Sequence, residues 1–528
     1  MKYILLFITV LSTSLLQAQQ ADVLIRNGRI IDGTGNNWYY ADIAITNGKI
    51  IAIGKLSQYS ASKVIDAKGL YVAPGFIDVH THIEGDEAKA PDAKSFILDG
   101  VTSVVAGNCG ESADDMAQYF RFIDSLKLSI NVAALVGHNT VRQLVMGEAN
   151  RTPTTEEQQR MEALVAKAMQ AGAVGLSTGL IYIPGTYSTT PEVVGLAKVA
   201  AQYNGVYATH MRNEADLVHE AIAEAINIGR QANIPVEISH FKLSGQNNWG
   251  RSNETLGLVQ KARAEGIEVT IDQYPYTASS TSLSTLFPDE MLADGADSIR
   301  ARIDNPTTRA YIKNYMLARL KKRQQKHFTY CQIANYRADT SWNGKNIEEV
   351  NLLLGRKHNA AAEADLIIDM MYKGGASMVF HGMSEVDVKN IMQYPFNMFA
   401  SDASIRVFNS GVPHPRGYGT NARVLGKYVR QEKVLSLEEA IRRMTSLPAQ
   451  KFSLHNRGLL KPGMMADIVV FDASTVIDKS TYAQPHQYSE GFQYVMVNGA
   501  VVVDNAQHTG ARPGTVLYGQ GKTAQPSH

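Results

Sequence analysis

The stretch GFIDVHTH at positions 75–82 ends a short apolar run with two histidines, His80 and His82. Side chains two residues apart on a β-strand point to the same side, so both imidazoles are expected to converge on one point. Seven more apolar runs follow, separated by segments with helical character, and this alternation predicts parallel strands joined by crossover helices. The eight candidate strands are GFIDVHTH (75–82), VTSVVAGNC (101–109), INVAALVGH (130–138), AVGLSTGL (173–180), VYATHMR (206–212), PVEISHFK (235–242), EVTIDQYPY (268–276) and FNMFASD (396–402). Eight strands close an α/β barrel, so we predict a (β/α)8 barrel over residues 75–454.

A ninth apolar run, ASMVFHG (376–382), does not fit an eightfold count. It follows the longest gap between successive strands, and we place it at the edge of an insertion that spans about 287–375, before the last barrel strand. The basic stretch 313–327 lies within this insertion and is expected to be a solvated helix face.

Both ends of the chain carry short β segments with Asn-Gly pairs, at 27–28, 47–48 and 498–499. Asn-Gly between apolar runs is a strong signal for a hairpin turn. We therefore expect residues 19–74 and 455–528 to form one small β-sandwich domain, with a tail that frays after Arg512.

The first 18 residues have the features of a secretory signal peptide. A basic Lys2 precedes an apolar run that is shorter than the roughly 20 residues needed to span a bilayer, and Ala18 provides a small residue for cleavage. The mature protein is expected to be secreted or periplasmic, with no membrane partner once the signal is removed.

Composition excludes several classes of partner and scaffold. The 528 residues have a net charge of +1, which provides no basic field for nucleic acid, so no nucleic-acid partner is expected. Two cysteines, Cys109 and Cys331, cannot build a disulfide framework. The oligomeric state is left open.

Polar residues suited to metal binding stand at the ends of the predicted strands, where barrel enzymes build their active sites. Besides His80 and His82, they are Cys109 in GNCG, His210 in ATHMR, His240 in ISHFK and Asp402 in ASD. A thiolate and two imidazoles form a zinc ligand set that leaves a position open for water. Each residue has an ordinary alternative, because Cys109 and the histidines could fill the core and Asp402 could cap a helix.

These residues stand within motifs that resemble the N-acyl-D-amino-acid deacylases, or D-aminoacylases, of the amidohydrolase superfamily. PGFID with HTH identifies only the superfamily, whereas GNCG, STGLIY and DQYPYTASST are more specific. The resemblance covers about residues 22 to 505. The matching motifs are PGFIDVHTH (74–82), GNCG (107–110), STGLIYIPG (177–185), ATHMR (208–212), ISHFK (238–242), DQYPYTASST (272–281), ASD (400–402), HPRGYGT (414–420), MTSLPA (444–449) and RGLLKPGMMADIVVFD (457–472).

The resemblance implies a zinc-dependent hydrolase that cleaves N-acyl-D-amino acids into a carboxylic acid and a D-amino acid. It implies one tightly bound zinc on Cys109, His210 and His240. It also implies a second, weaker metal site at His80, His82 and Asp402, with Asp402 as the catalytic acid and base.

The substrate's carboxylate needs cationic or hydrogen-bonding groups beside the metal. Lys242 lies two residues beyond His240, and Arg416 lies in HPRGYGT, so both are candidates for this contact. By resemblance, Tyr182 and Tyr274 are also candidate substrate contacts. Ordinary roles remain open for all four, as an ion pair, a loop brace or core aromatics.

Other functions compete with this reading. A cyclic-amide hydrolase of the hydantoinase or dihydroorotase type is disfavoured because STGL, on the fourth strand, has no lysine to carboxylate. A hydrolase of peptides that contain D-residues is compatible with export. A catalytically inactive binding protein on the same barrel would be expected to have lost ligands, and no ligand is missing from this sequence.

Overall fold

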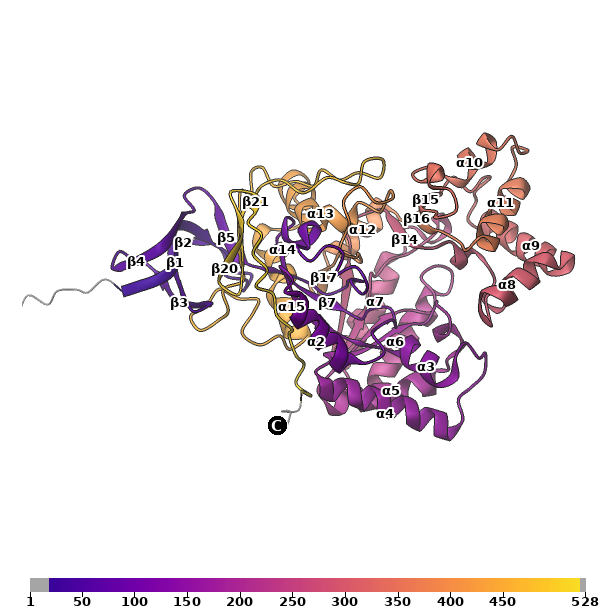
Figure 1. Cartoon of the computed structure of the whole chain (residues 1–528), viewed down its shortest axis with the longest axis horizontal. Coiled ribbons are helices and arrows are strands. Elements are labelled where there is room, and N and C mark those ends of the chain that lie inside the picture. The colour runs from indigo at the N-terminus through magenta and orange to yellow at the C-terminus, as the bar shows by residue number, and fades with distance from the viewer. Residues whose placement is uncertain (1–18, 523–528) are drawn as a thin grey trace, which may run out of the picture.

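A computed structural model describes residues 19–522 of the chain. A barrel occupies the middle, with a β-rich domain at one side and a helical insertion at the other (Figure 1). The signal peptide expected at residues 1–18 lies outside the described residues and stays a prediction. Within residues 19–522, every helix is either too short or too polar to reach across a lipid bilayer.

The eight predicted runs form the eight strand positions of the barrel, which confirms the predicted fold class. Every residue of these strands is buried, because the strands have the barrel interior on one side and helices on the other. The third run is split into β8 and β9 at Leu135. The strands are β6 (Phe76–Asp78), β7 (Val101–Ala106), β8 (Asn131–Ala134), β9 (Val136–Gly137), β10 (Gly175–Gly179), β11 (Val206–His210), β12 (Val236–Ile238), β13 (Val269–Gln273) and β17 (Asn397–Phe399).

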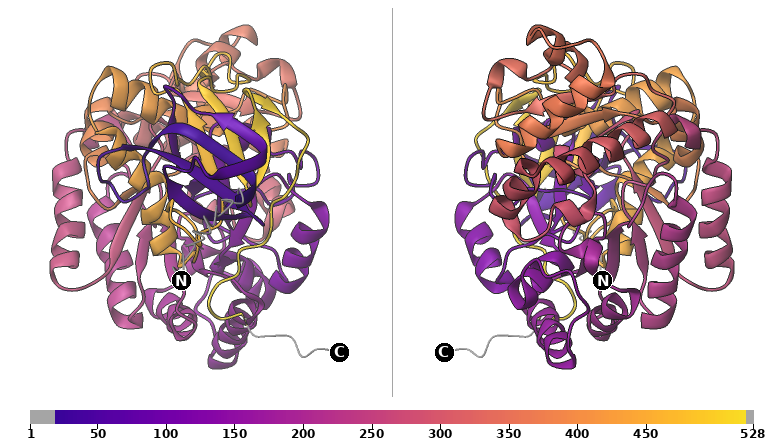
Figure 2. Two further views of the ribbon diagram at one scale, coloured as in Figure 1. Left: turned by 90° about the vertical axis from the view of Figure 1, so that its left-hand side faces the viewer. Right: turned by 90° about the vertical axis from the view of Figure 1, so that its right-hand side faces the viewer.

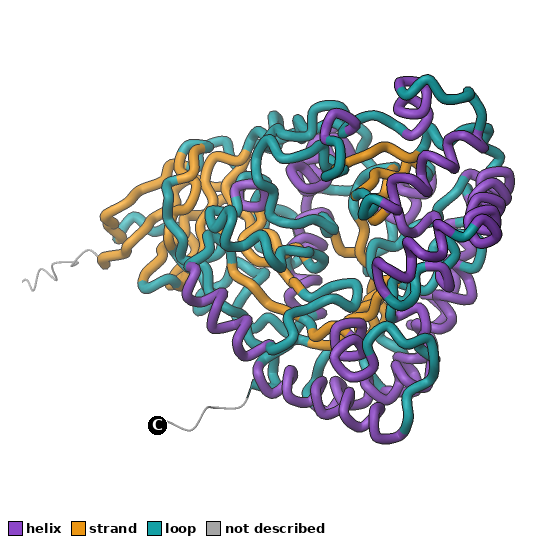
Figure 3. The backbone as a smooth tube through the Cα atoms, turned by 45° about the vertical axis from the view of Figure 1, so that its right-hand side comes forward, coloured by secondary structure: helices purple, strands orange, loops and turns teal. Residues whose placement is uncertain are grey.

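The barrel closes between its first and last strands, beside the expected site. Thr81 and Ala403 form a parallel bridge, and the backbone N–H of Asp402 donates to the carbonyl of His80 at 2.9 Å. Closure therefore brings residues that are more than 300 positions apart to one edge. The tube view in Figure 3 shows the strands enclosed by helices and loops.

Helices cover the outside of the barrel, and their ends follow the expected local signals. Thr154 and Glu157 form a capping box at the start of α4, which satisfies the first free N–H groups of that helix. The helices are α1 (Lys94–Ile97), α2 (Met116–Leu126), α3 (His138–Met146), α4 (Thr155–Ala171), α5 (Thr190–Gln202), α6 (Val218–Ala232), α7 (Ser252–Ala264), α12 (Glu385–Met392), α13 (Arg416–Arg423), the π-helical η6 (Val424–Gln431), α14 (Leu437–Met444) and α15 (Ser446–Lys451).

Strands from both chain ends pair in one nine-stranded sheet, which faces the viewer in Figure 2 (left), with its indigo and yellow strands side by side. The ends meet where β5 and β18 run antiparallel, with Val72 opposite Val470. The order is β21-β20-β19-β18-β5-β1-β2-β3, with β4 also against β1. The strands are β1 (Gln19–Ile30), β2 (Tyr39–Thr46), β3 (Lys49–Gly54), β4 (Tyr59–Asp66), β5 (Tyr71–Pro74), β18 (Ile468–Phe471), β19 (Phe492–Val497), β20 (Ala500–Asp504) and β21 (Gln507–His508).

One of the three expected Asn-Gly hairpins is wrong. Asn47 and Asn498 do turn the chain between antiparallel strands, β2 to β3 and β19 to β20. Asn27, with φ of 60°, instead lies inside β1 at a register shift between Ile25 and Gly28. The irregularity lets one long strand pair first with β4 and then with β5, which sequence spacing could not reveal.

The insertion has its own sheet and its own apolar core. Three antiparallel strands, in the order β14-β16-β15, share one apolar core with helices α8 to α11. The ninth apolar run is the central strand of this sheet, and β14 and β16 flank the expected span 287–375 on both sides. The elements are β14 (Ala278–Ser282), η3 (Leu283–Leu286), η4 (Asp289–Met291), α8 (Gly295–Asp304), α9 (Pro306–Lys322), β15 (Cys331–Asn335), η5 (Thr340–Trp342), α10 (Ile347–Leu353), α11 (Ala360–Tyr372) and β16 (Ser377–His381).

The expectation of a fraying tail after Arg512 is wrong for its described part. Val516 bridges to Val132 of β8, Gly514 N–H donates to Leu128 O at 2.8 Å, and Gly519 N–H donates to Gly172 O at 2.8 Å. Backbone hydrogen bonds, which composition does not report, fix this segment against the barrel.

A buried ion network ties α3 to α5. Arg142 donates to both oxygens of Glu192, at 2.7 and 2.6 Å, and His138 Nε2 lies 2.9 Å from Glu192 Oε1. Burial raises the pKa of Glu192, but contact with His138 and Arg142 outweighs it and lowers the pKa overall. His138 is thus a structural residue.

We predict that Glu192→Ala costs about 3–5 kcal/mol of unfolding free energy at neutral pH, because it leaves the buried Arg142 unpaired. Since the pKa of Glu192 is lowered by folding, its contribution is present above the unfolded pKa and is lost as the pH falls through the folded pKa. Urea unfolding measures this, and the exposed Glu156→Ala is the control. A loss no greater than that of the control would contradict this role.

Candidate active site

A cavity of about 1240 Å³ opens at the carboxyl ends of the barrel strands. Nine of the ten candidate residues line it, and the tenth, His80, is fully buried next to them. The nine are His82, Cys109, Tyr182, His210, His240, Lys242, Tyr274, Asp402 and Arg416.

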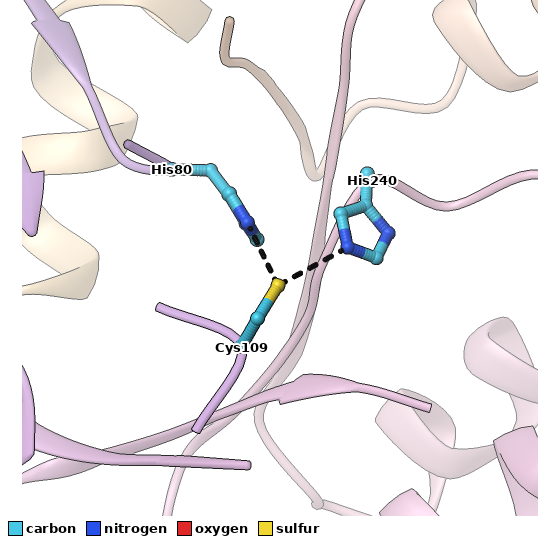
Figure 4. Close-up of side chains that lie close together, drawn as sticks. All are labelled: His80, Cys109 and His240. Atoms are coloured by element: carbon cyan, nitrogen blue, oxygen red, sulfur yellow. Dashed lines mark hydrogen bonds between the residues drawn. The ribbon is translucent and has the colours of Figure 1, made fainter. Parts of the chain in front are cut away.

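The thiol of Cys109 lies at the centre of the polar cluster. Its Sγ is 3.3 Å from His80 Nε2, 3.6 Å from His210 Nδ1 and 3.6 Å from His240 Nε2. Figure 4 shows the side chains of His80 and His240 approaching the sulfur from different parts of the barrel. A single ion could therefore contact the thiol and neighbouring imidazoles together.

The GNCG turn is what points Cys109 inward. Ser177 on β10 receives the N–H of Gly110 at 3.0 Å and donates to the carbonyl of Gly107 at 2.5 Å. A Cβ at Gly107 would lie 2.1 Å from Leu135 O, so only glycine fits there. The fourth strand, which offers no lysine, thus supplies a serine that holds the cysteine turn.

The structure brings the expected zinc ligands Cys109, His210 and His240 together, and it adds His80 to them. His80, Cys109 and His240 offer ligand atoms that lie within 4.8 Å of one another, as do His210, Glu214 and His240. The two expected metal positions are therefore contiguous, with His80 shared between them.

His80, His82 and Asp402 form the second expected group. Asp402 Oδ1 lies 3.3 Å from His82 Nε2 and 3.8 Å from His80 Nε2, and Asp402 Oδ2 lies 2.8 Å from Arg416 Nη1. Burial would raise the pKa of Asp402, but Arg416 and His82 lower it well below its usual value. Asp402 is therefore an ionised carboxylate.

Three of these residues adopt the left-handed backbone conformation that non-glycine residues rarely use. The φ angles are 53° at Cys109, 35° at His240 and 50° at Asp402. Such strain collects at functional sites, where the surrounding structure maintains it. The left-handed conformation occurs just after each strand ends, and all three side chains line the cavity.

The donor set fits a zinc ion. Burial lowers the pKa values of His210 and His240 well below normal, so both imidazoles are neutral and able to coordinate. Burial and the nearby carboxylates Asp402 and Glu214 raise the pKa of the Cys109 thiol, so a cation is needed to stabilise its thiolate. Sulfur, imidazole and carboxylate are the ligands that zinc prefers.

Two carboxylates behind the ligands were missed by sequence reasoning. Glu214 Oε1 lies 2.8 Å from His240 Nδ1, and Asp272 Oδ2 lies 3.4 Å from His80 Nδ1. Carboxylates at this position orient metal-binding histidines. Asp272 lies in β13, in a run that the sequence already marked, whereas Glu214 follows β11 in a loop without periodicity.

The candidate substrate contacts are all placed at the cavity wall. Lys242 Nζ contacts Glu214 Oε1 at 2.5 Å, and Arg416 stacks over the buried Tyr274 ring at 4.5 Å. The Tyr182 hydroxyl lies 3.0 Å from Thr281 of the insertion. Lys242 and Arg416 are thus both paired with carboxylates of the site.

The insertion supplies one wall of the cavity, which the sequence did not predict. Arg319 and Arg323, from the stretch expected to be a solvated helix face, line it together with Arg337 and Lys373. In all, eight basic and four acidic side chains line the cavity, so its wall favours an anionic ligand.

The chain is similar to known amidohydrolases over most of its length. A model of the "Amidohydrolase family" matches residues 63–503. An N-acyl-D-glutamate deacylase of Alcaligenes xylosoxydans xylosoxydans is 36% identical over 521 residues, covering 94% of this chain and 97% of that protein.

Two solved structures are similar over nearly their whole length. The N-acyl-D-glutamate deacylase of Bordetella bronchiseptica, in complex with zinc and a phosphonate that mimics the tetrahedral intermediate, has a TM-score of 0.81 and 36% identity, covering 95% of this chain and 100% of that one. A D-aminoacylase described with a binuclear metal centre has a TM-score of 0.80 and 33% identity, covering 94% and 100%.

We predict that Cys109→Ser loses tightly bound zinc while keeping its fold, because the thiolate is the central donor. Cys331→Ser is the matched control, since Cys331 is buried in β15 of the insertion and is not among the residues that line the cavity. Zinc per chain after dialysis and the circular dichroism spectrum are the measurements. Equal zinc content in the two variants would contradict the assignment.

We predict that Glu214→Gln lowers activity about 10- to 100-fold, because the carboxylate orients His240 and holds Lys242. The exposed Glu220→Gln on α6 should keep full activity. Steady-state kinetics on both variants measure the difference, and an unimpaired Glu214→Gln would rule out this positioning role.

Proposed function

The chain belongs to the amidohydrolase family, and from this we propose that it is a zinc-dependent hydrolase that releases D-amino acids from N-acyl-D-amino acids. One observation carries the proposal. The Cys109 thiol, which replaces a strand-four lysine as ligand, lies within 3.6 Å of nitrogens of His80, His210 and His240. The relatives with this activity are similar over nearly the full length.

The metal proposal follows from the donor set. Cys109, His210 and His240 would hold one zinc ion tightly, and His80, His82 and Asp402 would hold a second ion more weakly. The pairing of Asp402 with Arg416 supports weaker binding of the second ion, because the Arg416 guanidinium competes with that ion for the Asp402 carboxylate. When bound, zinc makes water acidic enough to attack near neutral pH and polarises the amide carbonyl.

Asp402 would act as the general base and acid. The contacts with Arg416 and His82 keep it ionised and fix its direction toward the cavity. It would take a proton from the attacking water and deliver it to the amide nitrogen, so that the amine leaves in its neutral form. The products are a carboxylic acid and a free amino acid.

The substrate's carboxylate would bind to the basic wall of the cavity. Lys242 and Arg416 are closest to the metal ligands, and Tyr182 and Tyr274 would pack against the substrate. Glu214 already contacts Lys242, and Asp402 already contacts Arg416, so both basic side chains are held in place. The substrate's carboxylate would add a further charged contact to these pairs.

Export would place the enzyme among extracellular acyl amino acids and peptides. The features of residues 1–18 support a secreted or periplasmic location. The net charge of +1 supports small molecules, rather than nucleic acid, as partners.

The test is hydrolysis of paired N-acetyl-D- and N-acetyl-L-amino acids by the wild type and by Asp402→Asn. We expect cleavage of D-isomers by the wild type. We expect a loss of at least 100-fold in kcat for the variant, which should keep the tightly bound zinc and its melting temperature.

Several results would contradict the proposal. Cleavage of L-isomers alone would overturn the stereochemical assignment. Cleavage of hydantoins or dihydropyrimidines in place of linear amides would favour a cyclic-amide hydrolase. An Asp402→Asn variant that behaves like wild type in ligand binding, with no turnover by either protein, would favour a binding protein.

A further inference from the structure

A second group of potential metal ligands lies in the insertion, outside the cavity. His327 is in the loop between α9 and β15, Glu348 is in the first turn of α10, and His358 is in the connection from α10 to α11. Each offers one ligand atom, and the three atoms lie within 4.8 Å of one another. Among the described residues that line the active-site cavity, none belongs to this group.

The contacts within the group are direct. His358 Nε2 lies 2.6 Å from Glu348 Oε1, and His327 Nδ1 lies 3.4 Å from the same oxygen. The two imidazole rings stack with centroids 4.6 Å apart and planes inclined by 27°. Two imidazoles thus converge on one carboxylate oxygen from two different segments.

A buried carboxylate supports the arrangement from behind. Glu363, in the first turn of α11, is fully buried, and its Oε1 lies 2.6 Å from His327 Nδ1. Its other oxygen accepts the backbone N–H of Phe328 at 2.8 Å, which fixes the carboxylate. Because Glu363 contacts Nδ1, the nitrogen of His327 that remains for a metal ion is Nε2. A carboxylate on the other ring nitrogen is the usual partner behind a metal-binding histidine.

Helix capping alone does not explain this group. Acidic residues are favoured in the first turn of a helix, which would account for Glu348 and Glu363. It does not account for two stacked imidazoles directed at the same carboxylate. The group also places two carboxylates, those of Glu348 and Glu363, at 2.6 to 3.4 Å from the imidazoles, and oxygen and nitrogen donors of this kind suit a divalent cation.

We propose that His327, Glu348 and His358 form a second zinc site, which cross-links three segments of the insertion, with Glu363 orienting His327. Two imidazoles and a carboxylate are a ligand set that zinc uses, with a fourth position left for water. The exposed fractions of the side chains are 26% for His327, 21% for Glu348 and 57% for His358, so an ion can enter from solvent. The role is structural, because the group does not face the cavity.

The test compares zinc binding by four full-length proteins. They are the wild type, His358→Ala, Glu348→Gln and the control His219→Ala, which removes a histidine that contacts a carboxylate, Glu254, at 3.2 Å. All four keep every ligand of the barrel site. Zinc per chain after equilibrium dialysis, and the rate of substrate hydrolysis, are measured for each.

We expect the wild type and His219→Ala to bind one more zinc ion per chain than His358→Ala and Glu348→Gln, with the same hydrolysis rate in all four. Zinc-edge anomalous diffraction should place the extra ion between His327, Glu348 and His358. Equal zinc content in the four proteins, or an anomalous map of zinc-soaked wild-type crystals with no peak at this position, would overturn the proposal. Neither result depends on the function proposed for the barrel site.

Discussion

The active site depends on one constraint: a thiol, imidazoles and carboxylates share a small buried space at one end of the barrel. The Cys109 sulfur lies 3.3 to 3.6 Å from nitrogens of three histidines, and Asp402 is ionised close by. Burial raises the pKa of the thiol and lowers the pKa values of His210 and His240. A divalent cation resolves this conflict, since it stabilises the thiolate and binds the neutral imidazoles.

Much of the surrounding structure maintains this arrangement. Barrel closure places the segment after β17, with Asp402, beside the segment after β6, with His80. Ser177 accepts a hydrogen bond from the turn that carries Cys109. Behind the candidate ligands, Glu214 contacts the Nδ1 atom of His240 at 2.8 Å. Asp272 accepts the backbone N–H of His240 at 2.8 Å and lies 3.4 Å from His80 Nδ1. The left-handed backbone at three of the site residues is maintained by the surrounding structure.

Sequence periodicity predicted the barrel well because its strands are buried on both sides and read as apolar runs that end in polar residues. It failed where pairing depends on distant segments. Asn27 lies in a strand irregularity instead of a hairpin, and the tail near Val516 is fixed by hydrogen bonds to the barrel. In the site, the candidate ligands at strand ends were predicted from the sequence and the structure brings them together, but Glu214 and the insertion's Arg319 lie in segments whose position only the fold determines.

Coordination of zinc by Cys109 is measured most directly by the zinc K-edge X-ray absorption spectrum of active enzyme that holds one zinc ion per chain. We expect one sulfur neighbour at about 2.3 Å together with nitrogen neighbours at about 2.0 to 2.1 Å. A spectrum of fully active enzyme with no sulfur neighbour would contradict this coordination, because Cys109 could then not be a ligand.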